Sequence, residues 1–278
     1  MPAKPNNKNE FLIAVRNGAV IGAVLLVFAL PWLRPQPETK APVALPPVST
    51  APAERPAPAL RLADFGDVVP SAAVRQVANW AVHTGDAQGR SVVILDKKAA
   101  RVYALDPAGK LVASAPALLG AAIGDDSAPG IGDKPLSAVL PQEKTTPAGR
   151  FLARPGVNTQ GEDIVWIDYD AAVSMHRVRA TVAAERRLQR LLSVTEADNR
   201  ISFGCINLPV AFYEGVLSPT VQKTGAIVYV LPETRTPQEV FGSWDVTDPA
   251  AGPPVWALAQ HQAQDAGPLA PRQERELP

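Results

Sequence analysis

The pattern of hydrophobic and polar positions divides the chain into four parts. Residues 18–33 form an apolar run without a charged side chain. Such a run approaches the roughly 20 residues that a bilayer requires, and it predicts one N-terminal transmembrane helix. Prolines interrupt residues 35–60 and 248–278 too often for a packed core, which predicts a Pro-rich linker and a disordered tail. Residues 61–247 carry the periodic patterns of a folded domain.

The flanks of the apolar run predict its orientation. Basic residues outnumber acidic ones before it, so the positive-inside rule keeps the N-terminus in the cytoplasm. No small-x-small cleavage motif follows directly, which favours an uncleaved signal anchor over a removed signal peptide. Residues 1–34 are therefore predicted to be a cytoplasmic tail and signal-anchor helix. The chain is expected to cross the cytoplasmic membrane once and to place its domain in the periplasm or another extracytoplasmic space.

Within the folded part, strand patterns dominate. Apolar residues at helical spacing follow Ser71, which predicts a short helix capped by that side chain. Short apolar runs then predict strands at residues 91–96, 101–105, 111–119, 163–169, 171–178 and 225–231. Two short helices are expected at 183–192 and 208–217, and a long loop, of the length used for lids or binding, at 120–147. The domain is predicted to be mainly β with short helices.

Charge and cysteine content exclude several function classes. The 27 basic and 27 acidic residues give no net charge, so nucleic acid is not an expected partner. One cysteine forms no intrachain disulfide and falls short of the thiolates that structural zinc sites commonly use. The sequence predicts neither a metal nor an organic cofactor, and it identifies no protein partner.

The single cysteine, Cys205, lies where a strand-like run meets a predicted helix. With Asn207 as N-cap, the positive end of that helix would lie near the sulfur and lower the thiol pKa from about 8.5. Gly204 lets the backbone approach closely, and the amides of Gly204 and Cys205 could face a developing oxyanion. The alternative is that Cys205 is a small buried hydrophobic residue without chemistry.

The hexapeptide Ser-Phe-Gly-Cys-Ile-Asn at 202–207 resembles the signature of the L,D-transpeptidase (YkuD-type) family. That signature has Ser or Thr, usually His, then Gly and Cys, followed by an apolar residue and Arg or Asn. Residues 92–111 resemble the opening strands of the family, and 146–151 its Thr-Pro-x-Gly segment, so the resemblance covers about 91–231. It implies a divergent member with a sandwich-like or barrel-like β fold.

The resemblance also implies site residues. Cys205 would be the nucleophile, and a histidine upstream of it the base. His261 lies in the predicted tail and His83 ends a predicted helix, which leaves His176, on a predicted strand, in the family's order. An imidazole with a reference pKa of about 6.5 can accept the thiol proton. Ser202 and the Gly204 and Cys205 amides would stabilise the oxyanion, and Asn207 would shape the pocket.

Three features depart from the family pattern. Phe203 stands where the family usually has His, so substrate selection is expected to differ. Arg177 follows the candidate base where Gly is usual, although its backbone carbonyl could still orient the imidazole. The chain between base and nucleophile is longer than usual by the insertion 179–199. Three arginines of this insertion, Arg186, Arg187 and Arg190, are better explained as the solvated face of a helix than as substrate ligands. Arg200 and Arg177 are candidates to bind substrate carboxylates, because guanidinium groups bind carboxylates bidentately.

The resemblance therefore implies a peptidoglycan L,D-transpeptidase that forms a cysteine acyl-enzyme with stem peptides. With water as acceptor, the same acyl-enzyme makes a hydrolase or amidase. A third possibility is an inactive, membrane-anchored wall-binding module, favoured by Phe203 and Arg177 and opposed by the joint presence of Cys205 and His176.

Overall fold

The computed structural model describes residues 59–254. The predicted signal anchor at 1–34, most of the linker at 35–60 and most of the tail at 248–278 lie outside these residues. Between residues 59 and 254, no helix is long and apolar enough to cross a membrane. The prediction of an N-terminal transmembrane helix falls on residues that the structure does not describe.

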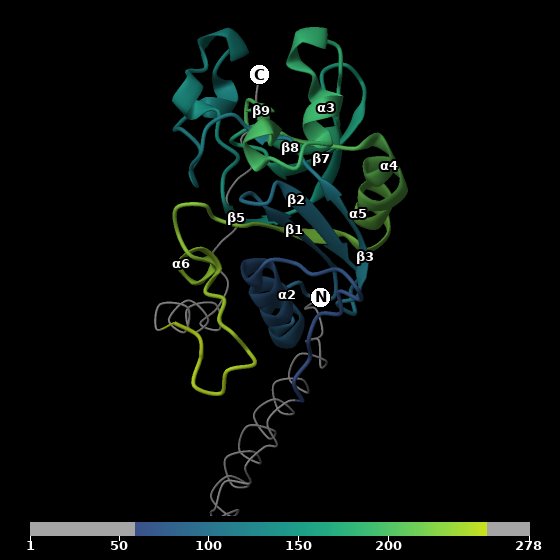
Figure 1. The fold of residues 1–278 in the computed structure, drawn as a ribbon, viewed down its shortest axis with the longest axis vertical. Helices are drawn as coiled ribbons and strands as arrows, with labels where there is room; N and C mark the ends of the chain where they lie inside the picture. Colours follow the sequence, from purple (N-terminus) through teal and green to yellow (C-terminus); the bar gives the residue numbers. More distant parts are fainter. Residues whose placement is uncertain (1–58, 255–278) are drawn as a thin grey trace, which may run out of the picture. The chain divides into compact units, whose positions relative to one another are not determined.

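A five-stranded sheet with the order β3-β2-β1-β11-β5 forms the centre of the fold (Figure 1). Its strands are β1 Ser91–Asp96, β2 Arg101–Leu105, β3 Leu111–Pro116, β5 Gly149–Leu152 and β11 Ala226–Val230. The central strands β1 and β11 are parallel, and the other pairs are antiparallel. Both are rich in β-branched residues and completely buried, as expected for strands that are covered on both faces.

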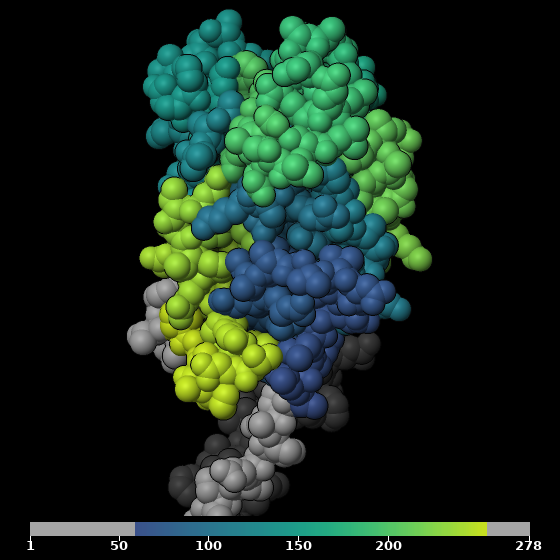
Figure 2. All heavy atoms as spheres, viewed as in Figure 1, coloured from purple at the N-terminus to yellow at the C-terminus, as the bar shows by residue number. Residues whose placement is uncertain are grey.

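Helix α2, Ala72–Thr84, covers one face of this sheet. The Ser71 side chain accepts a hydrogen bond from the Val74 amide, which confirms the predicted cap. The C-terminal part of the described chain packs beside this helix, as the yellow and blue atoms of Figure 2 show, and includes α6, Pro237–Phe241. There the rings of Trp80 and Trp244 meet edge to face at 6.3 Å.

The other face packs against a four-stranded sheet with the order β10-β8-β7-β6. Its strands are β6 Arg154–Val157, β7 Asp163–Asp168, β8 Val173–Arg177 and β10 Ile206–Leu208. Strands β8 and β10 are parallel, and the other pairs are antiparallel. Alternate residues of β7, β8 and β10 enter the core shared with the first sheet. The domain is therefore mainly β with short helices, as the sequence predicts.

Two of the predicted helices differ from the structure. The helix expected at 208–217 begins at Val210, because Leu208 belongs to β10, and continues through α4 Val210–Phe212, a π-helical turn Tyr213–Leu217 and α5 Ser218–Thr224. The helix expected at 183–192 is divided into a 3₁₀ turn, Ala183–Glu185, and α3, Arg187–Leu191. Arg186 interrupts it with a left-handed backbone at φ 48°.

The remaining elements are short. Strands β4, Leu119–Gly120, and β9, Arg200–Ser202, form a small parallel pair. The predicted loop at 120–147 is confirmed after its first residue: beyond β4 it contains only the 3₁₀ turns η2 Ile131–Asp133, η3 Leu136–Ala138 and η4 Pro141–Glu143. A further 3₁₀ turn, η6 Glu196–Asn199, leads into β9.

Candidate active site

Cys205 and His176 lie on the same face of the four-stranded sheet. Cys205 immediately precedes β10, and the register of the parallel pair places Ile206 beside Met175 and Asn207 beside His176. Strand side chains alternate between faces, so Met175 and Ile206 enter the core while Cys205 and His176 face the opposite side. The pairing of β8 and β10 thus brings the predicted nucleophile and base together.

The imidazole of His176 is held in one orientation. Its Nδ1 lies 2.8 Å from the Arg177 carbonyl oxygen. A carbonyl oxygen only accepts hydrogen bonds, so Nδ1 carries the proton and Nε2 is left as the basic nitrogen. Arg177 therefore supplies the orienting carbonyl expected from the sequence, although Gly is usual at this position in the family that the motif resembles.

The sulfur of Cys205 has three polar neighbours. Its Sγ lies 3.7 Å from the Ser174 hydroxyl oxygen and 3.5 Å from the Ala172 carbonyl oxygen. Burial raises the pKa of the Cys205 thiol, but the neighbouring His176 side chain and the contacts with Ser174 outweigh burial and hold this pKa below its ordinary value. Because the thiolate is the reactive form of cysteine, this environment favours nucleophilic chemistry.

The predicted helix cap at Asn207 is wrong. Asn207 belongs to β10, and the following helix begins at Val210 behind Pro209 without a side-chain cap. Pairing with β8 takes up the residues that would otherwise start the helix, so the helix N-terminus is separated from Cys205 by the whole of β10. The side-chain amide of Asn207 is buried. Its nitrogen donates to the Cys205 carbonyl at 3.2 Å, and its oxygen accepts from the Arg187 guanidinium at 2.7 Å.

Ser202 and Gly204 shape the loop that presents the cysteine. The buried Ser202 hydroxyl donates to the Cys205 carbonyl at 2.6 Å and accepts from the Gly204 amide at 3.1 Å. The Ser202 hydroxyl and the Gly204 amide thus form hydrogen bonds within the loop and do not point toward a substrate. Gly204 has φ 136°, and a Cβ there would lie 2.8 Å from the Thr145 carbonyl oxygen. The Thr146 hydroxyl donates to the Gly204 carbonyl at 2.8 Å, so the Thr-Pro-x-Gly segment supports this loop.

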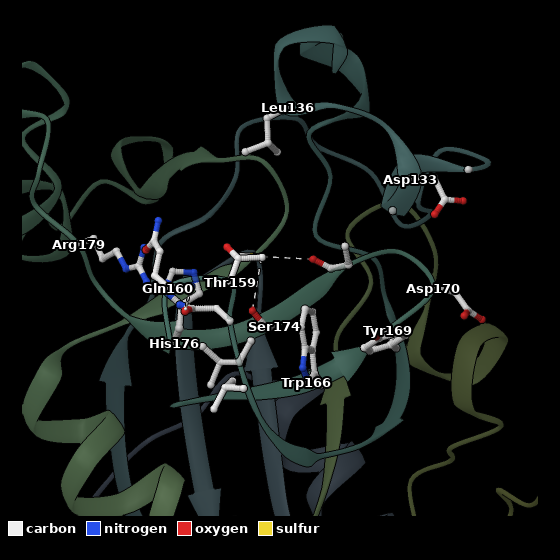
Figure 3. Close-up of a pocket in the computed structure, with 17 residues that line it drawn as sticks. Asp133, Leu136, Thr159, Gln160, Trp166, Tyr169, Asp170, Ser174, His176 and Arg179 are labelled. Atoms are coloured by element: carbon white, nitrogen blue, oxygen red, sulfur yellow. Dashed lines mark hydrogen bonds between the residues drawn. The ribbon is translucent and has the colours of Figure 1, made fainter. Parts of the chain in front are cut away.

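A cleft of about 990 Å³ opens in front of the cysteine (Figure 3). Its floor includes the outward-facing residues Ile164 and Trp166 of β7 and Ser174 and His176 of β8. Its walls come from the loop at 130–136 and the turn at 158–160. Trp166 meets the exposed ring of Tyr169 edge to face at 5.2 Å. The cleft thus combines apolar residues of its floor with polar groups beside the sulfur, as ligand sites commonly do.

The two candidate arginines for carboxylate binding do not line this cleft. Arg177 pairs with Asp163 at 2.8 Å and Glu214 at 2.7 Å. Arg200 pairs with Glu233 and donates to the Lys97 carbonyl at 3.0 Å. These acidic partners explain where both guanidinium groups point.

A different arginine, Arg179, does line the cleft. It extends beside Gln160 toward His176, while Asp133 and Asp170 lie at the other end (Figure 3). Arg179 pairs with Glu162 and Gln160. Phe203 does not line the cleft, because its ring packs under the Lys144 ammonium group at 4.0 Å.

A buried charge cluster, made of Lys97, Asp125, Arg200 and Glu233, supports the site from behind. The Lys97 ammonium nitrogen lies 3.0 Å from Asp125 and 3.2 Å from Glu233, and it donates to the Thr146 carbonyl at 2.9 Å. Lys97 thereby holds the segment whose hydroxyl supports the cysteine loop.

Sequence reasoning missed Ser174, Ala172, Thr146 and Trp166 as parts of the site. For Ser174 a signal existed, because a residue two positions before His176 on a strand shares its face. Ala172 acts through its backbone, which no side-chain pattern reveals. Within 59–254 no group of three or more His, Cys, Asp or Glu side chains is arranged to hold a metal ion.

A scan against protein-family models and a search of curated proteins find no match to this chain. Among solved structures, the L,D-transpeptidase of Xylanimonas cellulosilytica is similar at 16% identity and a TM-score of 0.31, over 51% of this chain and 60% of that one. The catalytic domain of the E. faecium L,D-transpeptidase gives 17% and 0.29, over 51% of this chain and 98% of that one.

The helical cell shape determining protein Pgp2 of Campylobacter jejuni gives 16% identity and a TM-score of 0.34, over 60% of this chain and 58% of that one. The chain thus spans about 60% of the first of these structures. The solved structures to which this chain is similar therefore include L,D-transpeptidase catalytic domains, the family whose signature the residues at 202–207 resemble.

Proposed function

We propose that this protein is a cell-wall enzyme, a peptidoglycan L,D-transpeptidase that works through a cysteine acyl-enzyme. The observation that carries the proposal is the meeting of the Cys205 thiol with the oriented imidazole of His176 at the floor of a cleft. A thiol with a lowered pKa beside a positioned base is the arrangement that activates a cysteine nucleophile.

In the proposed reaction, His176 Nε2 takes the proton of Cys205, and the thiolate attacks the carbonyl of the third stem residue. The bond to the terminal D-alanine breaks, and its amine leaves with the proton from His176. The amine of a second stem then attacks the thioester, His176 accepts its proton, and the thiol is regenerated. Because Ser202 already binds the Gly204 amide, the Cys205 amide is the proposed donor to the oxyanion.

Arg179 is the proposed carboxylate-binding residue of the cleft. It lines the cavity, whereas Arg177 and Arg200 are held by acidic partners elsewhere. Its neighbours Glu162 and Gln160 hold the guanidinium in place before substrate arrives. A stem-peptide carboxylate that enters this end of the cleft would gain a charge-assisted hydrogen bond.

The apolar run at 18–33 is the proposed anchor that places this chemistry outside the cytoplasmic membrane, with peptidoglycan stem peptides as the partner. The full-length chain should remain in the membrane fraction through high salt and alkaline wash. Its release into the soluble fraction would show that the segment is cleaved or does not span the membrane.

The test of the proposed function follows the acyl group. Full-length protein, purified in a mild detergent, is incubated with a tetrapeptide stem and a second stem that carries a free amine, and both protein and products are measured by mass spectrometry. We expect a thioester on Cys205, release of D-alanine and a cross-linked product. Cys205→Ala should abolish all three, and His176→Gln should slow them about 10²–10⁴-fold.

One control and two outcomes complete this test. His83→Gln removes a histidine that lies outside the cleft and should leave the rates unchanged. A free tripeptide in place of the cross-linked product would identify a hydrolase. Binding of stems by a folded protein that never forms a thioester would identify a wall-binding module and contradict the proposal.

A further inference from the structure

Ser174 contacts the reacting sulfur although no motif singles it out. It lies on β8 two residues before His176, so both side chains face the cleft. Its hydroxyl oxygen is 3.7 Å from the Cys205 sulfur, a contact drawn in Figure 3. The residue is only 4% exposed. Within 59–254 the Cys205 sulfur is the only hydrogen-bond partner of this hydroxyl, so the sulfur is the group that satisfies this buried side chain.

We propose that Ser174 is a catalytic residue whose hydroxyl donates a hydrogen bond to the Cys205 thiolate and so increases the fraction of reactive thiolate. This inference rests on the proposed function, in which Cys205 is the nucleophile. It assigns to the protein a third catalytic side chain besides Cys205 and His176.

The neutral thiol and the thiolate of Cys205 require different hydrogen-bond partners, and the groups around the sulfur provide both kinds. The Ala172 carbonyl oxygen, 3.5 Å from the sulfur, can only accept, so it binds the neutral thiol through its S–H group. When the proton moves to His176 Nε2, the S–H bond breaks, an N–H bond forms and the electron pair stays on sulfur. The thiolate then requires donors, and the Ser174 hydroxyl can rotate to supply one.

The local energetics favour this role. Hydrogen bonds to a charged group are stronger than those between neutral groups, and they gain strength where water is excluded. The backbone amide of Ser174 also contributes to the lowered pKa of the Cys205 thiol, after the opposing effect of burial and the larger effect of His176. Because that amide remains in any variant of residue 174, a substitution tests the hydroxyl alone.

The test measures the pH dependence of Cys205 alkylation by iodoacetamide in the full-length chain, which contains no other cysteine. Loss of one hydrogen bond to the thiolate in Ser174→Ala should raise the apparent pKa by about one unit. The less stabilised thiolate is also more nucleophilic, so the limiting rate at high pH should rise about threefold. Below the wild-type midpoint the two effects combine to slow alkylation about threefold.

Matched variants separate the hydroxyl from packing. Ser174→Thr and Ser174→Val have nearly the same shape, but only the threonine keeps the donor, so the valine variant should show the higher midpoint. This pair also decides the question if Ser174→Ala does not fold. Ser91→Ala removes another buried strand serine, bonded to Thr224 outside the cleft, and should leave the midpoint unchanged.

Equal midpoints for folded wild type and Ser174→Ala, or for the threonine and valine variants, would overturn the proposal. Alkylation requires no peptidoglycan, so its outcome is separate from that of the cross-linking test. A shifted midpoint in a protein that never joins stems would support the role of Ser174 while contradicting transpeptidation. Cross-linking with an unshifted midpoint would do the reverse.

Discussion

The buried charge cluster behind the candidate site predicts that replacing Lys97 strongly lowers the free energy of unfolding of the domain. The Lys97 side chain is completely buried, and its ammonium nitrogen lies 3.0 Å from Asp125 and 3.2 Å from Glu233. Arg200 also pairs with Glu233, so two cations balance two anions within the cluster, and at its edge the more exposed Arg235 lies 3.7 Å from Asp125. Each charge is stable there only because its partners replace water.

Lys97→Met keeps most of the side-chain length but leaves Asp125 and Glu233 with Arg200 as the one cation inside the cluster and the more exposed Arg235 at its edge. Breaking a buried ion pair by removing one partner costs about 3–5 kcal/mol. A domain of this kind has a total free energy of unfolding of about 5–15 kcal/mol. The substitution should therefore consume a large share of the stability. It also removes the donor to the Thr146 carbonyl, so the support of the Gly204 loop is weakened as well.

Urea denaturation of the full-length chain, followed by circular dichroism, measures this cost. Lys98→Met, at the exposed neighbouring position, is the matched control and should change the free energy of unfolding by less than about 0.5 kcal/mol. Adding Glu233→Gln to Lys97→Met restores charge neutrality within the cluster and should recover part of the loss. A Lys97→Met protein within about 1 kcal/mol of wild type would refute the reasoning that these charges depend on one another.

Three further predictions follow from the same structure. Gly204→Ala should cost about 1–3 kcal/mol by urea denaturation because of its φ of 136° and the close Thr145 carbonyl, whereas Gly215→Ala, with open space at its Cβ, should be neutral or stabilising. Arg179→Gln should raise KM for a tetrapeptide stem about tenfold or more while circular dichroism stays unchanged, and an unchanged KM would exclude a carboxylate contact. Burial raises the pKa of Asp125, but hydrogen bonds from Thr234, the Glu233 amide and Lys97 hold this pKa well below its ordinary 3.8. The ionised Asp125 carboxylate therefore stabilises the fold above that value, and this contribution is lost as the pH falls below it. Between about pH 4 and pH 2, the free energy of unfolding measured by urea denaturation should decline less in Asp125→Asn than in wild type.

Sequence patterns predicted the parts of this fold that local periodicity determines. The cap at Ser71 and the strands β1, β2, β7, β8 and β11 all depend on residues close in the chain, and the structure contains them with shifts of at most two residues at their ends. The helix expected at Asn207 failed because Ile-Asn-Leu reads equally well as the end of a strand or the start of a helix. Only the pairing of β10 with β8 decides between them.

The same distinction between local sequence features and tertiary contacts applies to the candidate site. Cys205 and His176 could be predicted from chain order, but the directions of the arginines could not. Arg177 and Arg200 are turned from the cleft by Asp163, Glu214 and Glu233, which lie 14 to 37 positions away in the sequence. Such partners become neighbours only through the tertiary fold.

The register of β8 and β10 also explains how the insertion 179–199 is compatible with the site. The insertion lies between the end of β8 and the beginning of β9, so it leaves the sheet after the base and returns before the nucleophile. The free-energy cost of closing a loop rises only slowly with its length, whereas a one-residue slip of β10 against β8 would turn Cys205 away from His176 and toward the core. The geometry of the candidate nucleophile and base therefore depends on strand pairing rather than on their separation in sequence, and lengthening the insertion should preserve the lowered thiol pKa more readily than any substitution that shifts this register.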